Sequence, residues 1–525
     1  MKKRNFSGII IAVFTAALVV ACYKDQSSEA TIEIPDITIR VDGAETDTLS
    51  IAYGDTLNLK AVVRQKGVSS SDFSFSWEFD LIAGSTKGRD VIGEADQLNY
   101  LVLNLPATKP YMLSLTVTNT KTDFSQMIYW PVYVTNPYGE GLLVAHTRDG
   151  GLHSDINLIS DTPVTYGWTG SSPKIHRDIF AFNNGGESIP GRITSMVSRL
   201  ATDLSVPNVS SFSKSMLMIG TQEHLFALSP VTYTTEYQDV ELFTSIDDDF
   251  GVKSIFAGGN NYQSYAIMGE GVLYNCCDMM DIQYSKVSYP NAEKAVFDAN
   301  CVAYTKIQQG HISGFDRLDH KFHYMIGPFA HSGSFDAIDT NGLTFDLSSA
   351  SCIAAGSTRN DDHMYIMKAG GKFYAVILPY NAPEGAYAYE VNLPDIDNAV
   401  TFAICDNAYV FYYATPTKIY SMVISGTSVM TNALTWKPDS SEEKITLLRQ
   451  YDQAWFGVGQ IAEYDYDMKL PTHRLQIIIA TYNQTKKEGK IYLRPFNVST
   501  GSFTTKTNGV YGGFGEILTV SSTLR

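Results

Sequence analysis

A paired-strand pattern returns about every 50 residues along most of this chain, and it limits the folds that the chain can adopt. In each copy, an apolar strand and a short polar or Gly-containing turn precede a second strand with large apolar and aromatic residues. The aromatic residues of five successive copies, Phe226, Tyr274, Tyr324, Tyr374 and Tyr420, lie 48, 50, 50 and 46 residues apart. One four-stranded blade of a β-propeller takes about 40 to 50 residues. The pattern therefore predicts a β-propeller; the alternative is an irregular β-sandwich with hairpins that only look periodic.

Seven copies of the pattern fit between residues 138 and 525 and predict seven blades. The predicted strand pairs are 142–145 with 156–158, 216–219 with 225–226, 265–268 with 273–274, 311–315 with 322–324, 364–367 with 373–374, 409–413 with 419–420, and 477–480 with 491–492. We expect residues 517–520 to complete the first blade and so close the ring. The step from Tyr420 to Tyr492 is longer, at 72 residues, and predicts an insertion around residues 436–449.

Residues 31–136 show a different pattern, the alternation of apolar and polar residues that is typical of half-buried strands. Phe73, Phe75, Trp77 and Phe79 alternate with polar residues, and segments 57–63 and 113–117 behave similarly. Six or seven such strands in about 105 residues match the size of an immunoglobulin-like sandwich. We therefore expect an all-β chain with a sandwich over residues 31–136, Trp77 in its core, and a propeller over residues 138–525.

The first 30 residues predict export and lipid attachment. Lys2, Lys3 and Arg4 precede an apolar run at residues 8–21, and these 14 residues are fewer than the roughly 20 needed to span a bilayer. Residues 19–22, Val-Val-Ala-Cys, match a lipobox, in which the Cys22 thiol accepts diacylglycerol. We expect a signal peptide at 1–21 and a lipidated tether at 22–30, held in the membrane by several acyl chains. The alternative is an uncleaved anchor with an incidental cysteine.

Two strands of the predicted sandwich resemble the polycystic-kidney-disease (PKD) family. Residues 75–79 (Phe-Ser-Trp-Glu-Phe) resemble its aromatic-x-Trp-x-Phe strand, and residues 111–118 (Tyr-Met-Leu-Ser-Leu-Thr-Val-Thr) resemble its Tyr-x-Val-x-Leu-x-Val strand. The usual Gly-Asp-Gly after the Trp strand is missing, since Asp80 leads into Leu81 and Ile82. With the lipobox, the chain resembles the PKD-like lipoproteins encoded beside SusC/SusD-type importers in Bacteroidetes. Residues 23–29 also resemble the signal that sends such lipoproteins to the outer face of the outer membrane.

The charge of the chain argues against a nucleic-acid partner, and its cysteine content argues against a full set of disulfides. Without residues 1–21 the chain has 36 basic and 55 acidic side chains, a formal charge of −19. Such a surface disfavours nucleic acid, which proteins bind through Lys and Arg contacts to phosphate. Five cysteines follow Cys22, an odd number without a Cys-x-x-Cys motif, and we expect them to be small buried hydrophobic residues.

The sequence contains no strong catalytic motif. It has no His-Glu-x-x-His, no Gly-x-Ser-x-Gly and no P-loop, and its ten histidines are scattered. We therefore predict a non-enzyme without cofactor or metal site, although a propeller can bring distant carboxylates together at its axis. For ligand or partner contacts the candidates are aromatic residues in predicted loops, which otherwise serve in packing. They are Trp168, Trp436, Tyr387 and Tyr389.

Two Asp-Thr-Leu triplets, at Thr48 and Thr56, resemble the O-glycosylation site of secreted Bacteroidetes proteins; the alternative is ordinary strand edges. The resemblance implies an outer-membrane, surface-exposed accessory subunit of a SusC/SusD-type importer that captures oligopeptides or oligosaccharides. Two alternatives are a surface propeller enzyme acting on glycans or peptides, and a purely structural scaffold.

Overall fold

The structure is a computed structural model that forms two compact units, Met1–Pro137 and Tyr138–Arg525. It describes residues 35–85, 88–107, 109–202, 214–246, 250–257, 263–278, 281–287, 295–305, 311–326, 331–340, 343–434, 436–453 and 470–523. The predicted signal peptide and Cys22 therefore lie outside the described residues. Within these residues, no helix has the length and apolar character needed to cross a membrane.

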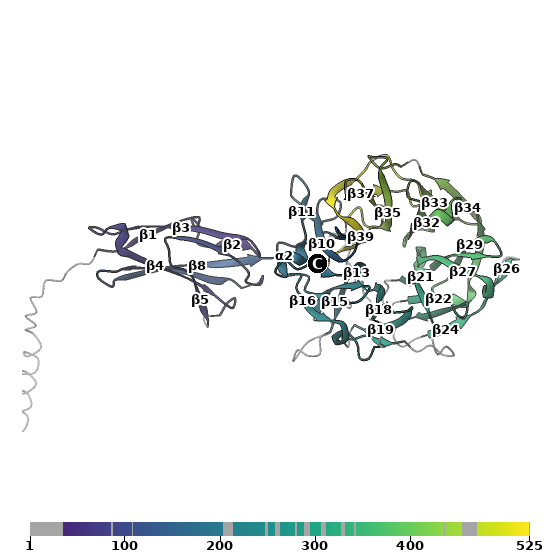
Figure 1. Ribbon diagram of the computed structural model, residues 1–525, viewed down its shortest axis with the longest axis horizontal. Coiled ribbons are helices and arrows are strands. Elements are labelled where there is room, and N and C mark those ends of the chain that lie inside the picture. Colours follow the sequence, from purple (N-terminus) through teal and green to yellow (C-terminus); the bar gives the residue numbers. More distant parts are fainter. Residues whose placement is uncertain are drawn as a thin grey trace, which may run out of the picture. The chain divides into compact units, whose positions relative to one another are not determined.

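The first unit consists of two sheets, as expected for a sandwich (Figure 1). One has the strand order β1-β3-β6 and the other β2-β8-β7-β4-β5, and only the β2–β8 pairing is parallel among the described strands. The strands are β1 (Thr38–Asp42), β2 (Leu49–Ala52), β3 (Thr56–Arg64), β4 (Phe73–Asp80), β5 (Arg89–Gly93), β6 (Gln97–Leu101), β7 (Tyr111–Asn119) and β8 (Ser125–Thr135).

The core of the first unit forms around Trp77, which is fully buried, as the sequence predicts. Its ring stacks on that of Trp130 at 6.4 Å between centroids, and its indole N–H donates to the Ala95 carbonyl oxygen at 2.9 Å. The alternation in β4 follows from the pleat, because every second residue points to the core face. Register agrees with this, since Trp77 lies opposite the buried Leu115 of β7.

The second unit contains seven antiparallel sheets of at least four strands among the described residues, numbered here sheets 1 to 7. Sheet 1 joins both ends of the unit: β39 (Glu516–Ser522) pairs with β9 (Leu142–Thr147), followed by β10 (His153–Ser160) and β11 (Lys174–His176), and β12 (Ile189–Pro190) also pairs with β10. Sheet 2 is β13 (Ile193–Ala201), β14 (Lys214–Thr221), β15 (Leu225–Leu228) and β16 (Thr235–Gln238). Sheet 3 is β17 (Val252–Phe256), β18 (Gln263–Met268), β19 (Val272–Cys277) and β20 (Ser285–Lys286).

The other four sheets each use consecutive strands. Sheet 4 is β21 (Phe297–Thr305), β22 (His311–Asp316), β23 (Lys321–Ile326) and β24 (His331–Phe335), and a hairpin of β25 (Ala337–Thr340) and β26 (Leu343–Asp346) follows it. Sheet 5 is β27 (Ser351–Ser357), β28 (His363–Ala369), β29 (Lys372–Leu378) and β30 (Tyr387–Val391). Sheet 6 is β31 (Thr401–Ile404), β32 (Val410–Ala414), β33 (Ile419–Ser425) and β34 (Ser428–Ala433). Sheet 7 is β35 (Glu443–Gln450), β36 (Gln476–Asn483), β37 (Glu488–Pro495) and β38 (Gly509–Phe514).

These sheets stand around a common centre (Figure 1). The innermost strands are β39, β13, β17, β21, β27, β31 and β35, and each contacts the next in this order until β35 contacts β39 again. Apolar clusters fill the spaces between neighbouring sheets; one, for example, joins Met218 of β14 to Ala266 of β18. The second unit is therefore propeller-like.

Helical structure is minor in the described residues. One α-helix, α2 (Ile179–Asn183), packs against β10. The 3-10 turns are η1 (Ser70–Asp72), η2 (Asp239–Leu242), η3 (Leu347–Ser349), η4 (Arg359–Asp361), η5 (Pro383–Gly385) and η6 (Ile396–Asn398).

The predicted strand pairs are confirmed, since each falls on the second and third strands of a different sheet. The expected addition of residues 517–520 to the first blade is also confirmed, because these residues belong to β39, which pairs with β9. The predicted insertion at 436–449 is wrong. That range contains most of β35, the innermost strand of sheet 7, and the extra length lies in the link from β35 to β36.

Two buried polar contacts join neighbouring sheets. Between sheets 2 and 3, Arg199 of β13 donates to Asp278 Oδ1 through Nε at 3.0 Å and Nη2 at 2.8 Å. Between sheets 4 and 5, the rings of His311 and His363 stack with centroids 3.9 Å apart. His363 is also held by Ser313, with Oγ 2.5 Å from its Nδ1. The side chains of all four named ionisable residues are almost fully buried.

Candidate functional site

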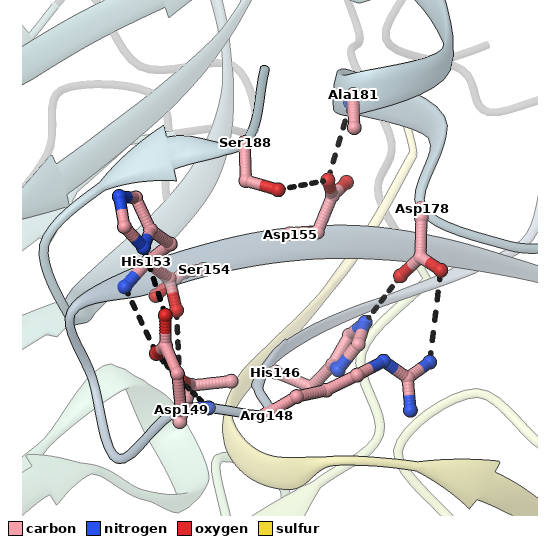
Figure 2. A pocket seen from close by; sticks show the side chains of 10 residues that line it. His146, Arg148, Asp149, His153, Ser154, Asp155, Asp178, Ala181 and Ser188 are labelled. Atoms are coloured by element: carbon pink, nitrogen blue, oxygen red, sulfur yellow. Dashed lines mark hydrogen bonds and ion pairs between the residues drawn. The ribbon is translucent and has the colours of Figure 1, made fainter. Parts of the chain in front are cut away.

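A polar cavity of about 290 Å³ lies at one end of sheet 1 (Figure 2). Its walls come from the end of β9, the β9–β10 turn, the start of β10, the start of α2 and the residue before β12. The lining residues are His146, Thr147, Arg148, Asp149, His153, Ser154, Asp155, Asp178, Ala181 and Ser188.

The carboxylate of Asp178 joins a buried histidine to an exposed arginine (Figure 2). The Gly515 backbone N–H donates to His146 Nδ1 at 3.1 Å, so Nδ1 carries no proton and the neutral ring is protonated at Nε2. His146 Nε2 then donates to Asp178 Oδ1 at 2.9 Å. This hydrogen bond is the main cause that lowers the pKa of Asp178. Arg148 Nη2 lies 3.6 Å from Asp178 Oδ2, beyond hydrogen-bond length.

The β9–β10 turn forms around a second aspartate. Asp149 Oδ1 accepts the backbone N–H groups of Gly151 at 3.3 Å and His153 at 3.0 Å, and Oδ2 lies 2.8 Å from His153 Nδ1. The backbone N–H of His153 is the main cause that lowers the pKa of Asp149. Gly150 and Gly151 have φ of 78° and 101°, a conformation that L side chains rarely adopt. The Asp-Gly-Gly sequence thus fixes the turn and places His153 at the edge of the cavity.

Asp155 of β10 anchors the start of α2. Its carboxylate accepts the backbone N–H groups of Ile156 at 2.7 Å and of Phe180 and Ala181 at 3.1 Å each, together with the Ser188 hydroxyl at 3.3 Å. The helix has no side-chain hydrogen bond from its own N-cap residue, so Asp155 satisfies its first N–H groups from a neighbouring strand. Burial raises the pKa of Asp155, and the backbone donors offset part of that effect.

Most polar groups of the lining thus already make hydrogen bonds within the protein. The Ser154 hydroxyl donates to the Gly191 carbonyl oxygen at 2.7 Å and accepts the Ile193 N–H at 3.2 Å, so it is not an activated nucleophile. His146 has both ring nitrogens engaged and cannot act as a base toward a ligand. In the part of the chain that the structure describes, no group of three His, Cys, Asp or Glu side chains is arranged to hold a metal ion.

The predicted aromatic contacts do not line this cavity. Trp168 lies between β10 and β11, half-buried, with its ring against Gly170. Trp436 lies between β34 and β35 and packs edge-on against Tyr492, with ring centroids 5.2 Å apart. Both side chains are therefore largely used in packing.

The two tyrosines are not in a loop but on β30, the last strand of sheet 5. Tyr387 and Tyr389 are half-buried and contact each other edge to face, and the Tyr389 hydroxyl donates to the Gly426 carbonyl oxygen at 3.1 Å. Burial raises the pKa of Tyr387. The two threonines proposed for glycosylation, Thr48 before β2 and Thr56 at the start of β3, are both exposed.

Sequence reasoning missed the cavity residues. A usable signal existed at the β9–β10 turn, because Asp149, Gly150 and Gly151 form a turn sequence between two apolar strands and His146 and His153 flank it. Asp178 gave no signal, since only the fold brings it to His146, 32 positions away.

Comparison with known proteins adds a family match for the first part of the chain. Residues 22–192 match the model of the PKD-like family. The matched segment extends beyond the first unit and contains every residue of the cavity lining. No curated protein is similar to this chain in sequence at a significant level.

Solved structures resemble the chain only distantly. A crystal structure of a quinonprotein alcohol dehydrogenase-like protein from Bacteroides thetaiotaomicron is 12% identical, and the match covers 93% of this chain and 96% of that one with a TM-score of 0.41. Apo AztD from Citrobacter koseri is 9% identical, with 86% of this chain and 98% of that one covered and a TM-score of 0.35. At these values neither match supports a conclusion about function.

Proposed function

We propose that this protein is a non-catalytic binding subunit: a surface lipoprotein anchored through Cys22, with a PKD-like sandwich and a seven-bladed propeller. It captures oligosaccharides or oligopeptides as an accessory of a SusC/SusD-type importer in the outer membrane. The lipobox and the PKD-like match at residues 22–192 support the anchor and the family. The seven sheets and the pairing of β39 with β9 support a closed seven-bladed ring.

The observation that carries the binding role is the state of the cavity's acid–base groups. Asp149 and Asp155 accept backbone N–H groups, His146 has both ring nitrogens engaged, and the Ser154 hydroxyl bonds to backbone. Catalysis by proton transfer needs a base that can reach the substrate, and only the exposed side chains of Asp178 and His153 remain for that role. A lining that is fixed in this way instead provides a preorganised polar surface for a ligand.

Purification from native membranes tests this role. The protein should co-purify with a SusC/SusD-like pair, and the purified mature chain should release no product from mixed glycans or peptides. Co-purification without binding of any glycan or peptide would favour the structural scaffold. An absence of importer subunits would remove the accessory role.

One observation favours a second candidate, an enzyme that acts on glycans at the surface. Burial raises the pKa of Asp155, while the hydrogen bond from His146 lowers the pKa of Asp178. Two carboxyls with pKa values shifted in opposite directions can divide the roles of acid and base. This candidate predicts turnover of a glycan that Asp155→Asn or Asp178→Asn abolishes while the circular dichroism spectrum is unchanged.

A further inference from the structure

Two polar groups of the cavity keep unused hydrogen-bonding capacity. Asp178 Oδ1 accepts from His146, whereas Oδ2 forms an ion pair with Arg148 at 3.6 Å, a distance longer than a direct hydrogen bond. The side chains of Arg148 and Asp178 are 51% and 43% exposed, so both can reach a ligand in the cavity. Figure 2 shows the two side chains pointing toward each other from different elements, Asp178 from the start of α2 and Arg148 from the β9–β10 turn.

Asp178, the acceptor of this pair, is held in place by hydrogen bonds to other residues of the protein. His146 is buried, and the Gly515 N–H fixes its ring so that Nε2 points its proton at Asp178. The Asp178 backbone N–H donates in turn to the Asn157 side chain at 3.1 Å. The carboxylate is therefore oriented before any ligand arrives, which reduces the entropy cost of binding.

The pair defines the chemistry of its ligand. A guanidinium only donates hydrogen bonds and an ionised carboxylate only accepts them. A ligand that satisfies both must offer an acceptor and a donor side by side, and two neighbouring hydroxyl groups of a sugar do so without adding charge. The further carboxylates of Asp149 and Asp155 disfavour an anionic ligand such as a uronic acid.

The size of the cavity limits how much of the ligand enters. Its volume of about 290 Å³ is at the lower end of the range for ligand pockets, roughly 300 to 1,000 Å³. A cavity of this size takes the end of an oligomer rather than its length. The end of an oligopeptide also offers a donor and an acceptor, but it adds a full charge: a terminal carboxylate would face the aspartates of the lining, and a terminal ammonium would face Arg148.

We propose that the cavity binds the terminal residue of a neutral oligosaccharide, with two vicinal hydroxyl groups on Asp178 and Arg148. This assignment rests on the proposed binding role and selects saccharides over peptides. His146 is a positioning residue, because it acts on the ligand only through Asp178.

Ligand-observed NMR with the purified mature chain tests the assignment. The probes are methyl glycosides of glucose, galactose and mannose, analogues that lack one hydroxyl of each vicinal pair, glucuronic acid and the peptide Ala-Ala-Ala. At least one neutral glycoside should bind, and the loss of one hydroxyl from the bound pair should weaken binding by about tenfold or more, as expected for a hydrogen bond to a charged group. Binding of Ala-Ala-Ala or glucuronic acid in preference to every glycoside would overturn the assignment.

Substitutions of Arg148 and Asp178 test whether glycoside binding depends on this pair. Arg148→Gln and Asp178→Asn should each weaken binding of the glycoside about tenfold or more. Among the described residues the Arg148 side chain contacts the Asp178 side chain and not the backbone, so Arg148→Gln keeps the test valid if Asp178→Asn disturbs α2. The matched control is Lys368→Gln, which removes an exposed ion pair with Asp397 on sheet 5 and should leave binding unchanged. Glycoside binding that both cavity variants retain would refute the site.

Two combinations of results distinguish the proposed saccharide site from the proposed accessory role. If the protein co-purifies with importer subunits but no glycoside binds, the saccharide site is refuted and the accessory role stands. If a glycoside binds with the expected variant pattern but no importer subunit co-purifies, the saccharide site stands and the accessory role is lost.

Discussion

Acidification from pH 7 to pH 5 should destabilise the second unit, because two histidines are buried between sheets 4 and 5. His311 and His363 stack at 3.9 Å, and a proton on either ring would place a charge in the interior. Burial lowers the pKa of His311 from 6.5 to about 3, and the Asp361 backbone offsets only part of that effect. Burial also lowers the pKa of His363.

The size of the effect follows from proton linkage. Between pH 6.5 and 3 the unfolded chain binds a proton at His311 that the folded chain does not, so the stability present above pH 6.5 is lost as the pH falls. For these two pKa values, the change from pH 7 to 5 costs about 2 kcal/mol of unfolding free energy for His311 alone. The carboxylates with lowered pKa, such as Asp178, lose their contribution only below about pH 4 and do not interfere.

Urea unfolding at pH 7 and pH 5, followed by fluorescence, measures this loss. The variant His311→Phe keeps a ring in the stack but cannot be protonated, and its loss of stability between the two pH values should be about 2 kcal/mol smaller than that of the unmodified chain. The control is Tyr380→Phe, which changes a ring beside His311 without changing a group that titrates in this range. Equal losses in the unmodified chain and in His311→Phe would refute the argument.

Three other changes test further parts of the structure. Arg199→Met should lower the unfolding free energy of the second unit by about 3 to 5 kcal/mol in urea, because it leaves the buried Asp278 carboxylate without its cation, whereas Lys372→Met at an exposed pair should leave the unfolding free energy almost unchanged. Deletion of residues 515–525 removes β39 and should make the second unit sensitive to proteases, since β9 and β13 lose their neighbour; a fragment as resistant as the full chain would contradict the closure of the ring by β39. Cys22→Ala should abolish the incorporation of a labelled fatty acid, and continued acylation would exclude Cys22 as the attachment site.

Much of the fold could be predicted because its units are local in sequence. A strand pair joined by a short turn leaves two apolar runs at fixed spacing, so β18 with β19 and β28 with β29 are visible in the sequence as pairs. Even the closing strand could be predicted, because an apolar segment at residues 517–520 remained after the other pairs were assigned. The first strand of most sheets has an irregular register, as β35 has between Ile445 and Leu447, and such a bulge interrupts the alternation by which a strand is recognised in the sequence.

The cavity could not be predicted in the same way, because its parts are distant in sequence. His146 depends on Gly515 for its tautomer and on Asp178 for its partner, and no periodic pattern links these three positions. The candidates that the sequence offers are aromatic residues, because exposed rings often bind ligands. In the structure Trp436 packs against Tyr492, and the Tyr389 hydroxyl donates to the Gly426 carbonyl oxygen, so both side chains have partners within the protein.

The pairing of β39 with β9 determines when the cavity can exist. A ribosome makes residues 146–188 long before residue 515, so a partly made chain has every lining residue but not the N–H that orients His146. Nearly the whole second unit must be made before that last contact forms. The proposed saccharide site is therefore complete only in a chain that extends to Gly515, and a product that ends before this residue lacks the contact that orients His146.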